Sequence, residues 1–306
     1  MELHPLAGIY AASLTPTKGN RHAPAPEAAT DYLTFLAKRG CHGALLFGTT
    51  GEGPSFSTQE RIALIKSAAA VRQTHPKFRL LAGTGTPSLE ATIALNQAAF
   101  DAGFDGVVTL PPFYFRTASQ EGLFRWFDIV IRDSVPSGKY LLGYHIPKVS
   151  GVPLPLDLLA RLKDAHPDKF AGIKDSSHDL DHARKLGQRF GKNLLVLNGT
   201  DSYLHDALAY DAQGAITAPA NIMSPQMRAL WDAYLKGEDT TKLQEEITLI
   251  REILEKYMPF PPILKALAAE LFDFPLWAVR PPLDNTPNEI VQKAKLEIQV
   301  ALQKSA

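Results

Sequence analysis

The feature that most constrains the fold is an alternation of strand-like and helix-like segments that repeats eight times. Short apolar runs, each ending in turn residues, recur at regular intervals through the first three quarters of the chain. They span residues 8–16, 43–50, 80–86, 106–112, 140–147, 170–177, 194–200 and 214–221. Each run is continuously apolar, which is typical of a strand buried on both faces of a parallel sheet.

Helical patterns fill the intervals, and several begin with a capping residue. Ser57 is followed three positions later by Glu60, which is the capping-box pattern, and Ser88 and Ser119 precede two other helices. Eight strand–helix units in succession predict an α/β fold, a (β/α)8 TIM barrel. A doubly wound open sheet is the alternative, but it requires a switch point that the even repetition does not indicate.

Near residue 235 the alternation stops, and only helical patterns continue to the end of the sequence. We therefore predict two parts. Residues 1–235 form the catalytic (β/α)8 barrel, and residues 236–306 form an additional C-terminal helical extension packed on it.

Composition excludes several classes of protein. Lys plus Arg and Asp plus Glu both number 32, so the formal charge is zero and the basic footprint of a nucleic-acid binder is missing. No apolar run approaches the length of a membrane span, and the first residues lack the pattern of a signal peptide. Cys41 is the single cysteine, which excludes an internal disulfide and fits a reducing compartment. We expect a cytoplasmic protein with neither nucleic-acid nor membrane partners.

The strand ends carry mostly hydroxyl groups, with two phenols and one ammonium. In a parallel barrel the chemistry lies where the strands run into the following loops. The side chains expected there are Thr15, Thr49, Thr50, Glu52, Tyr114, Tyr144, Lys174, Ser176, Asp201 and Thr217. His178 and His182 are one helical turn apart but lack a third ligand in sequence, and we interpret them as a solvated helix face. We expect neither a metal nor a cofactor.

Lys174 ends a core strand, where an unpaired ammonium is costly to bury. Either its stem reaches water, or it is a desolvated lysine whose lowered pKa makes a neutral amine available to attack a carbonyl. Tyr144 ends the preceding run; it is either a packed ring or a proton shuttle for that attack. The "GTTGEG" turn at 48–53 is a tight turn, a phosphate cradle, or a carboxylate site built on two adjacent hydroxyls, and we favour the last.

Six motifs occur in a specific order on successive strands. They are "GTTGEG" at 48–53, "PPFYFRTASQEG" at 111–122, "GYHIPKVSGV" at 143–152, "GIKD" at 172–175, "NGTD" at 198–201 and "VRPPL" at 279–283. With these motifs the chain resembles the dihydrodipicolinate synthase and N-acetylneuraminate lyase superfamily, on the sugar-acid aldolase and lyase side rather than the synthase side. The resemblance implies a (β/α)8 barrel with extra C-terminal helices and Schiff-base chemistry on pyruvate.

The resemblance also implies roles for single residues. Lys174 matches the Schiff-base lysine and Tyr144 the general acid and base, while Thr49 and Thr50 match the ligands of the 2-oxo acid carboxylate. Tyr114 matches the tyrosine that family members insert into a neighbouring subunit's site, which completes a Thr–Tyr–Tyr relay. We count Thr50 and Tyr114 among the catalytic residues, and we expect a homodimer at least and commonly a homotetramer.

Departures from the family pattern bear on the substrate. Val149 stands where synthases carry an arginine for the second substrate's carboxylate, and an apolar side chain cannot make that contact. Ser202 replaces the acidic residue with which lyases hold a glycerol tail. Asp201 fits either a polyol ligand or a helix cap. The predicted substrate-binding residues are Thr49, Thr50, Ser176, Gly199, Asp201 and the main chain of Ile216.

Together these residues predict a class I aldolase or lyase. It would cleave or form a 2-keto-3-deoxy sugar acid, or a related 4-hydroxy-2-oxo acid, through a pyruvate enamine. The same imine would serve a keto-deoxy acid dehydratase, an N-acetylneuraminate lyase or a dihydrodipicolinate synthase. A metal-dependent aldolase and a non-catalytic keto-acid binding protein are the alternatives from other classes.

Overall fold

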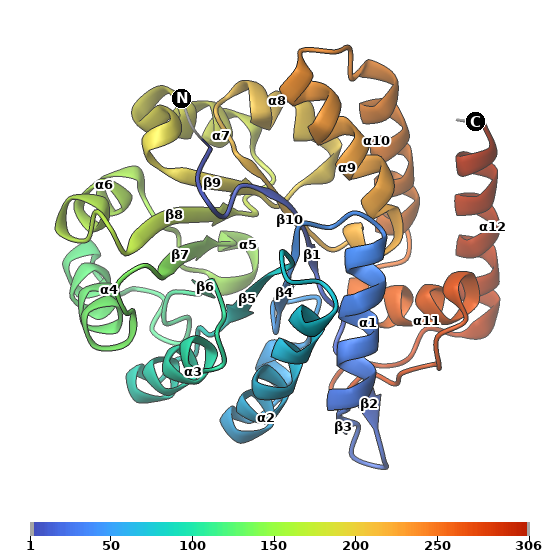
Figure 1. The fold of residues 1–306 in the computed structure, drawn as a ribbon, viewed down its shortest axis with the longest axis horizontal. Coiled ribbons are helices and arrows are strands. Elements are labelled where there is room, and N and C mark those ends of the chain that lie inside the picture. Colours follow the sequence, from blue (N-terminus) through green and yellow to red (C-terminus); the bar gives the residue numbers. More distant parts are fainter. Residues whose placement is uncertain (1–2, 305–306) are drawn as a thin grey trace.

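Eight parallel strands close into a barrel in the computed structural model, which describes residues 3–304 (Figure 1). The strands are β1 (Gly8–Ala12), β4 (Gly43–Leu46), β5 (Arg79–Gly83), β6 (Gly106–Thr109), β7 (Tyr140–His145), β8 (Phe170–Asp175), β9 (Leu195–Asn198) and β10 (Gly214–Thr217). Because β1 pairs with both β4 and β10, the sheet has no open edge. The predicted TIM barrel is confirmed, and the open-sheet alternative is wrong.

Helices cover the outside of the barrel between consecutive strands (Figure 1). They are α1 (Pro26–Lys38), α2 (Thr58–Ala68), α3 (Leu89–Asp101), α4 (Gln120–Ser134), α6 (Leu156–Ala165), α7 (Leu180–Phe190), α8 (Leu204–Ala209) and α9 (Ala220–Lys236). Ser57 and Glu60 form the predicted capping box at α2. Ser88 and Ser119 cap α3 and α4 through their side chains, as predicted.

The sequence patterns did not predict several short elements. The two-residue strands β2 (Thr17–Lys18) and β3 (Ala23–Pro24) pair as an antiparallel hairpin, and one helical turn, α5 (Pro147–Ser150), follows β7 directly. Pro147 starts that turn, and Gly151 ends it in the left-handed region at φ +69°, which favours glycine. Elements this short have no measurable periodicity. Of these elements, α5 lies at the mouth of the barrel and so bears on the active site.

Three further helices follow the barrel: α10 (Thr241–Glu255), α11 (Phe260–Phe272) and α12 (Asn288–Lys304). They agree with the helical patterns in the C-terminal part of the sequence. α10 packs beside α9 and against α12, and α11 also packs on α9 and α12 (Figure 1). The extension is therefore in contact with the last unit of the barrel.

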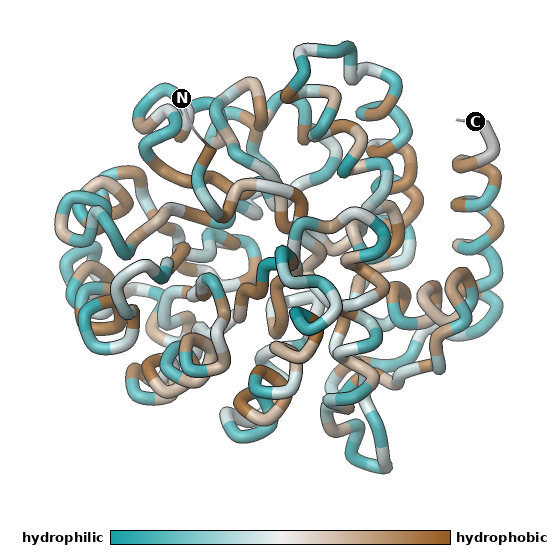
Figure 2. The backbone as a smooth tube through the Cα atoms, in the orientation of Figure 1, coloured by the Kyte–Doolittle hydropathy of each residue, from teal (hydrophilic) through white to brown (hydrophobic). Residues whose placement is uncertain are grey.

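Apolar side chains form two cores. One fills the barrel interior and includes Tyr10, Leu45, Leu81 and Leu142, and the other lies between the barrel and its helices. Figure 2 shows the brown, hydrophobic residues concentrated along the strands and on one side of the helices, with teal residues outside. A packed barrel interior leaves one polar end for chemistry.

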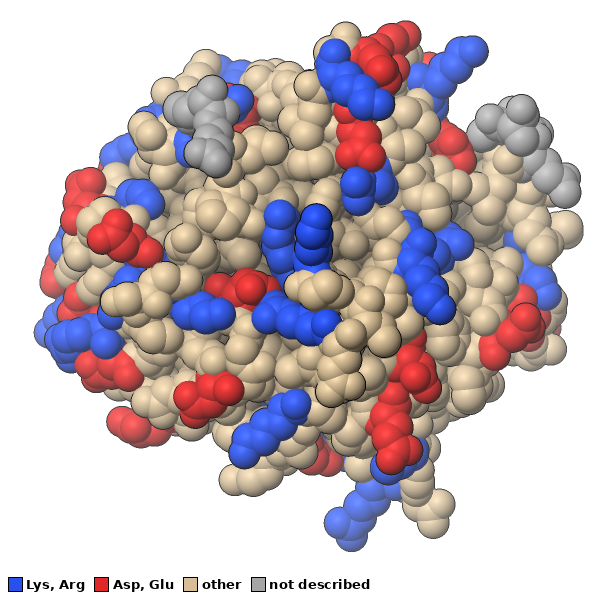
Figure 3. Space-filling model, in the orientation of Figure 1, with Lys and Arg blue, Asp and Glu red and all other residues tan. Residues whose placement is uncertain are grey.

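Charge is mixed on the face of the molecule that Figure 3 shows. Positive and negative side chains alternate around its rim, and several Lys and Arg side chains lie near its centre (Figure 3). Within residues 3–304, none of the helices combines the length and the apolar character needed to cross a membrane.

Candidate active site

Tyr144 and Lys174 are paired neighbours on adjacent strands, at the ends of β7 and β8. Their side chains are 4% and 3% exposed, and the Lys174 Nζ lies 4.2 Å from the centroid of the Tyr144 ring. The lysine therefore does not extend its stem to water. A buried amine lies beside a buried phenol at one end of the barrel.

The surroundings of Tyr144 favour release of its proton. Burial by itself would raise the pKa of the phenol. The nearby Lys174 charge and hydrogen bonds from Thr49, Lys174 and Ser176 outweigh this effect, so the pKa of Tyr144 is lowered. The Thr49 Oγ1 lies 3.3 Å from the phenol oxygen. A phenol with a lowered pKa is better matched to proton transfer near neutral pH.

The pair lines a cavity of about 380 Å³. This volume is in the range of small-molecule sites. The sequence-predicted residues that line it are Thr49, Thr50, Tyr144, Lys174, Ser176, Gly199 and Ile216. The structure thus brings together residues from five strand ends, as expected for the catalytic face of a barrel.

Asp201 corrects one prediction. It is fully buried and does not line the cavity, and its Oδ2 accepts a hydrogen bond of 2.7 Å from Nη1 of Arg251. It is the first residue of a 3₁₀ turn, Asp201–Tyr203, that has no side-chain cap. Asp201 therefore lies outside the cavity lining and caps no helix. One oxygen of its carboxylate, Oδ2, pairs with the guanidinium instead.

The two threonines of the "GTTGEG" turn differ in their contacts. The hydroxyl that reaches the phenol of Tyr144 belongs to Thr49, and not to Thr50, which the sequence predicts as a catalytic residue. Thr50 is buried and lines the same cavity. The geometry thus gives Thr49 the place beside the phenol, and Thr50 remains a predicted carboxylate ligand.

Tyr114 lies outside the cavity of its own chain. It is 75% exposed, and its ring packs edge-to-face against Phe115, which is 73% exposed, with centroids 5.2 Å apart. Two large aromatic side chains exposed side by side are unusual on a monomer surface. The relay to Tyr144 is not formed within one chain, so the predicted role of Tyr114 requires a second copy.

Residues of the C-terminal extension complete the cavity, and the sequence analysis missed them. Arg251 and Glu255 come from α10, Met258 from the following loop and Phe260 from the start of α11. Lys148 and His178 also line the cavity. The expectation that active-site residues lie at the ends of the barrel strands does not indicate α10, which belongs to the extension. The one local signal is the spacing of Arg251 and Glu255, which places them on one face of a helix.

A buried ion pair holds the "GTTGEG" turn in place. Glu52 has a left-handed backbone, φ +55°, and its carboxylate is paired with Lys265 of α11, with both side chains almost fully buried. The Glu52 Oε2 also accepts a hydrogen bond of 2.9 Å from the backbone N–H of Arg280. Burial lowers the pKa of Lys265, and Glu52 counteracts part of that effect. The extension therefore contacts the loop that carries both threonines.

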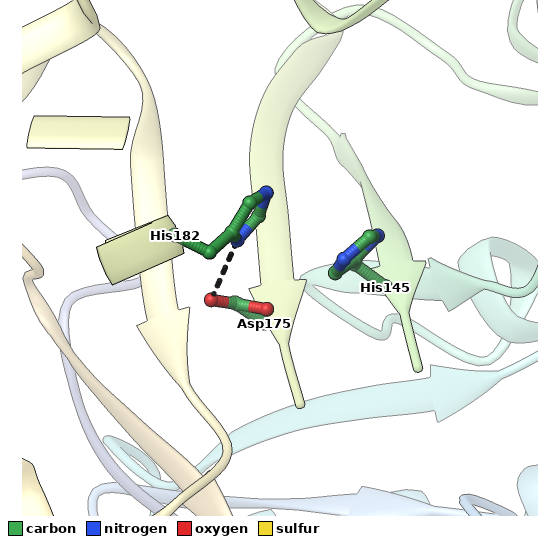
Figure 4. A group of neighbouring side chains, drawn as sticks. All are labelled: His145, Asp175 and His182. Carbon is green, nitrogen blue, oxygen red and sulfur yellow. Dashed lines mark hydrogen bonds and ion pairs between the residues drawn. The ribbon is translucent and has the colours of Figure 1, made fainter. Parts of the chain in front are cut away.

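His145, Asp175 and His182 form a polar cluster (Figure 4). His182 was predicted on a solvated helix face; this is wrong, because its Nδ1 lies 3.1 Å from Asp175 and its ring stacks on His145 at 4.6 Å. His178 precedes α7 and is not on the helix.

One ring nitrogen of each histidine already has a protein partner. The His145 Nδ1 accepts a hydrogen bond from the backbone N–H of Leu154, and the His182 Nδ1 lies 3.1 Å from the Asp175 carboxylate. A hollow of about 850 Å³ borders both histidines, but none of the predicted site residues lines it. We therefore place the chemistry in the smaller cavity, beside Lys174.

The sequence and the fold match one family throughout. The dihydrodipicolinate synthetase family model matches residues 5–303. An uncharacterized DapA-like lyase from Chloroflexus aurantiacus is 37% identical over 284 residues, which are 93% of each chain. A 4-hydroxy-tetrahydrodipicolinate synthase from Corynebacterium urealyticum is 35% identical over 212 residues, 69% of this chain and 67% of the relative.

Solved structures agree. YagE, a prophage protein of E. coli K12 in complex with pyruvate, has a TM-score of 0.89 at 25% identity, covering 97% of this chain and 99% of that one. A catalytic lysine mutant of the Ruminococcus gnavus sialic acid aldolase has a TM-score of 0.89 at 22% identity, covering 100% and 99%, which shows the common fold alone. With the same barrel and a family match over nearly its whole length, the chain belongs to the dihydrodipicolinate synthetase family.

Proposed function

We propose that the protein is a class I aldolase that cleaves a 2-keto-3-deoxy sugar acid, or forms one from pyruvate and an aldehyde. The observation that carries this proposal is the buried Lys174 amine, 4.2 Å from the ring of Tyr144, in a cavity with two adjacent threonines. The family contains lyases and synthases that act on small keto acids. The sugar-acid specificity is our inference for this chain.

The first half of the reaction forms the imine. The lone pair of the Lys174 amine attacks the C2 carbonyl, and a proton passes from the nitrogen to the oxygen to give a neutral carbinolamine. Tyr144 gives a second proton to that oxygen, water leaves, and a protonated imine remains. The hydroxyl of Thr50 holds the adjacent carboxylate, and Thr49 keeps its contact with the phenol.

The second half breaks the carbon–carbon bond. The Tyr144 phenolate takes the proton of the C4 hydroxyl, C4 becomes an aldehyde, and the C3–C4 electron pair moves into the imine to give an enamine. A proton then adds at C3, and water hydrolyses the imine to release pyruvate and the free amine. The reaction needs no external oxidant or reductant.

Val149 supports a sugar acid over the second substrate of the synthases. It is 62% exposed on α5 at the edge of the cavity. An isopropyl group offers no hydrogen-bond donor to a carboxylate. Since the tail of a sugar acid has no second carboxylate for an arginine to hold, we expect Val149→Arg to give no gain in the sugar-acid reaction.

The decisive experiment is trapping of the imine. Treatment with pyruvate and borohydride should add one reduced pyruvate unit to Lys174, detected by peptide mass, and Lys174→Arg should abolish the adduct. Pyruvate that binds without forming an adduct would instead identify a keto-acid binding protein. Activity that a chelator removes and that survives in Lys174→Arg would identify a metal-dependent aldolase.

A substrate panel separates the outcomes that share the imine. We would follow pyruvate release separately from water loss with keto-deoxy sugar acids, 4-hydroxy-2-oxoglutarate and N-acetylneuraminate. Release of pyruvate from the sugar acids supports the proposal. Loss of water without pyruvate would identify a dehydratase.

Replacing the phenol tests the proton transfers. For Tyr144→Phe we expect kcat to fall roughly 100- to 10,000-fold with little change in KM, because the phenol acts mainly in the transition state. Steady-state kinetics with the best substrate of the panel measures this. An unchanged kcat would remove Tyr144 from the mechanism.

A further inference from the structure

The outer end of the active-site cavity is built by the C-terminal extension and not by the barrel. Arg251 and Glu255, one helical turn apart on α10, line the cavity together with Met258 and Phe260. Lys174 lines the same cavity. A substrate whose C2 lies at Lys174 can therefore extend toward the side chains of α10.

The orientation of Arg251 is fixed by three contacts. Its Nη1 donates to Asp201 at 2.7 Å and its Nε donates to Glu255 at 2.7 Å, while its guanidinium lies 5.0 Å from the ring centroid of Phe260. The side chain is only 5% exposed. Among the described residues Nη2 has no hydrogen-bond partner, and Arg251 lines the cavity, so this group is available to a ligand.

Glu255 supplies an acceptor beside that donor. Its Oε1 accepts from Arg251, and the side chain is 46% exposed at the cavity, so Oε2 keeps its acceptor capacity. One fixed N–H donor next to one carboxylate acceptor matches a hydroxyl group, which both donates and accepts. Adjacent hydroxyls on a carbon chain fit such a pair well.

The charges at this end of the cavity cancel. Lys148, Arg251 and Glu255 line it, and Asp201, which lies outside the lining, is paired with Arg251, so two positive charges are balanced by two negative ones. Burial, with the neighbouring Arg251 and Lys148, lowers the pKa of His178, which favours the neutral form of that ring. A second carboxylate or a phosphate on the substrate would face the Glu255 carboxylate, and such like-charge contacts select against a ligand.

We propose that Arg251 and Glu255 bind the hydroxyl groups of the substrate's tail, so that this enzyme selects 2-keto-3-deoxy acids with an uncharged polyol tail over those with a second acidic group. The inference rests on the proposed aldolase function and deepens it. Asp201 acts through Arg251 as a positioning residue. This explains why an aspartate in the "NGTD" motif is fully buried away from the cavity.

The test compares substrates that differ only beyond C4. The probes are 2-keto-3-deoxygluconate and its galactonate epimer, which carry a polyol tail, 4-hydroxy-2-oxobutanoate, which has no tail, and 4-hydroxy-2-oxoglutarate, which has an acidic one. For the wild type we expect the highest kcat/KM with one of the polyol epimers.

Glu255→Gln is the main variant, because an exposed side chain is replaced without burying a charge. We expect the ratio of kcat/KM between the polyol and tail-less probes to fall about tenfold, the effect of one lost hydrogen bond to a charged group. The acidic probe should gain relative to the polyol probes. Glu252→Gln, on the same helix but outside the cavity lining, is the matched control and should keep the wild-type ratio.

Arg251→Lys keeps the charge but loses the planar set of donors, and should lower the same ratio. An unchanged ratio in Glu255→Gln, or a wild type that prefers the acidic probe, overturns the inference. A wild type that forms no borohydride-trapped pyruvate adduct overturns the proposed function itself. A normal adduct with an unchanged ratio overturns only the assignment of the tail site.

Discussion

At the scale of single residues, Thr49 and Thr50 differ in their contacts with the phenol of Tyr144, and we expect different roles for them. Tyr144 contacts Thr49 and lies against Lys174, whereas Thr50 lines the cavity without being the threonine at the phenol. The two threonines are adjacent in sequence and identical in chemistry. Their difference comes only from the direction in which the turn presents each hydroxyl.

Thr49→Val and Thr50→Val should therefore have different kinetic effects. Thr49→Val removes a hydrogen-bond partner of the phenol, so we expect kcat to fall about tenfold or more. Thr50→Val removes a predicted carboxylate ligand, and KM should rise by a similar factor with a smaller change in kcat. Steady-state kinetics separates the two, and the same kcat-to-KM pattern in both variants would contradict the division.

At the scale of elements, the extension supports the barrel loops from outside. α11 supplies Lys265 to the buried carboxylate of Glu52, and the segment before α12 supplies Arg280 to Glu52 and Glu60. These contacts join the "GTTGEG" turn and the start of α2 to residues more than 200 positions away. The position of the two threonines therefore depends on helices outside the barrel.

Lys265→Met should destabilise the protein strongly. It leaves the Glu52 carboxylate buried without its partner, which costs about 3–5 kcal/mol in the free energy of unfolding. Glu52→Gln in the same chain should restore part of the loss. Urea unfolding measures both. Lys295→Met, which breaks the more exposed Lys295–Glu270 pair, is the control and should cost less than about 1 kcal/mol; equal losses would contradict the buried-pair argument.

The Glu60–Arg280 pair should make stability depend on pH. Hydrogen bonds from Arg280 lower the pKa of Glu60 from 4.5 to about 2. A carboxylate whose folded pKa lies below its unfolded value stabilises above pH 4.5 and loses that contribution as pH falls toward 2.

Glu60→Gln should therefore cost about 1 kcal/mol at pH 7, a modest value because the pair is partly exposed. The gap to the wild type should narrow steadily between pH 5 and pH 3 in urea titrations. Glu90→Gln, an exposed first-turn glutamate of α3, is the control. A gap that stays constant across this range would exclude the pair as its cause.

At the scale of the whole molecule, the predicted catalytic role of Tyr114 requires a second copy of the chain. Tyr114 and Phe115 are exposed and lie outside the cavity of their own chain. Burial of such a pair against another subunit would remove apolar surface from water. The proposed relay then belongs to a dimer and not to one barrel.

Mixing two inactive variants tests this arrangement. Tyr114→Ala and Lys174→Arg should each be nearly inactive, but a mixed dimer contains one site with both Lys174 and a partner's Tyr114. With random pairing we expect about a quarter of wild-type activity. Subunit exchange by co-refolding, followed by activity assay, measures it. Activity no higher than the mean of the two variants would place Tyr114 outside the partner's site.

The sequence by itself determined the barrel, three helix starts, and Lys174 and Tyr144 at neighbouring strand ends. Strand runs, serine caps and strand-end positions follow from the local chemistry of a few adjacent residues, and parallel closure then brings the strand ends to one rim. Only the tertiary structure decided that Asp201 holds Arg251, that Glu52 pairs with Lys265, that His182 turns inward to Asp175, and that α10 lines the cavity. Each of these contacts joins side chains from separate elements, and their partners are selected by how helices pack on the barrel, which the spacing of residues along the chain does not encode.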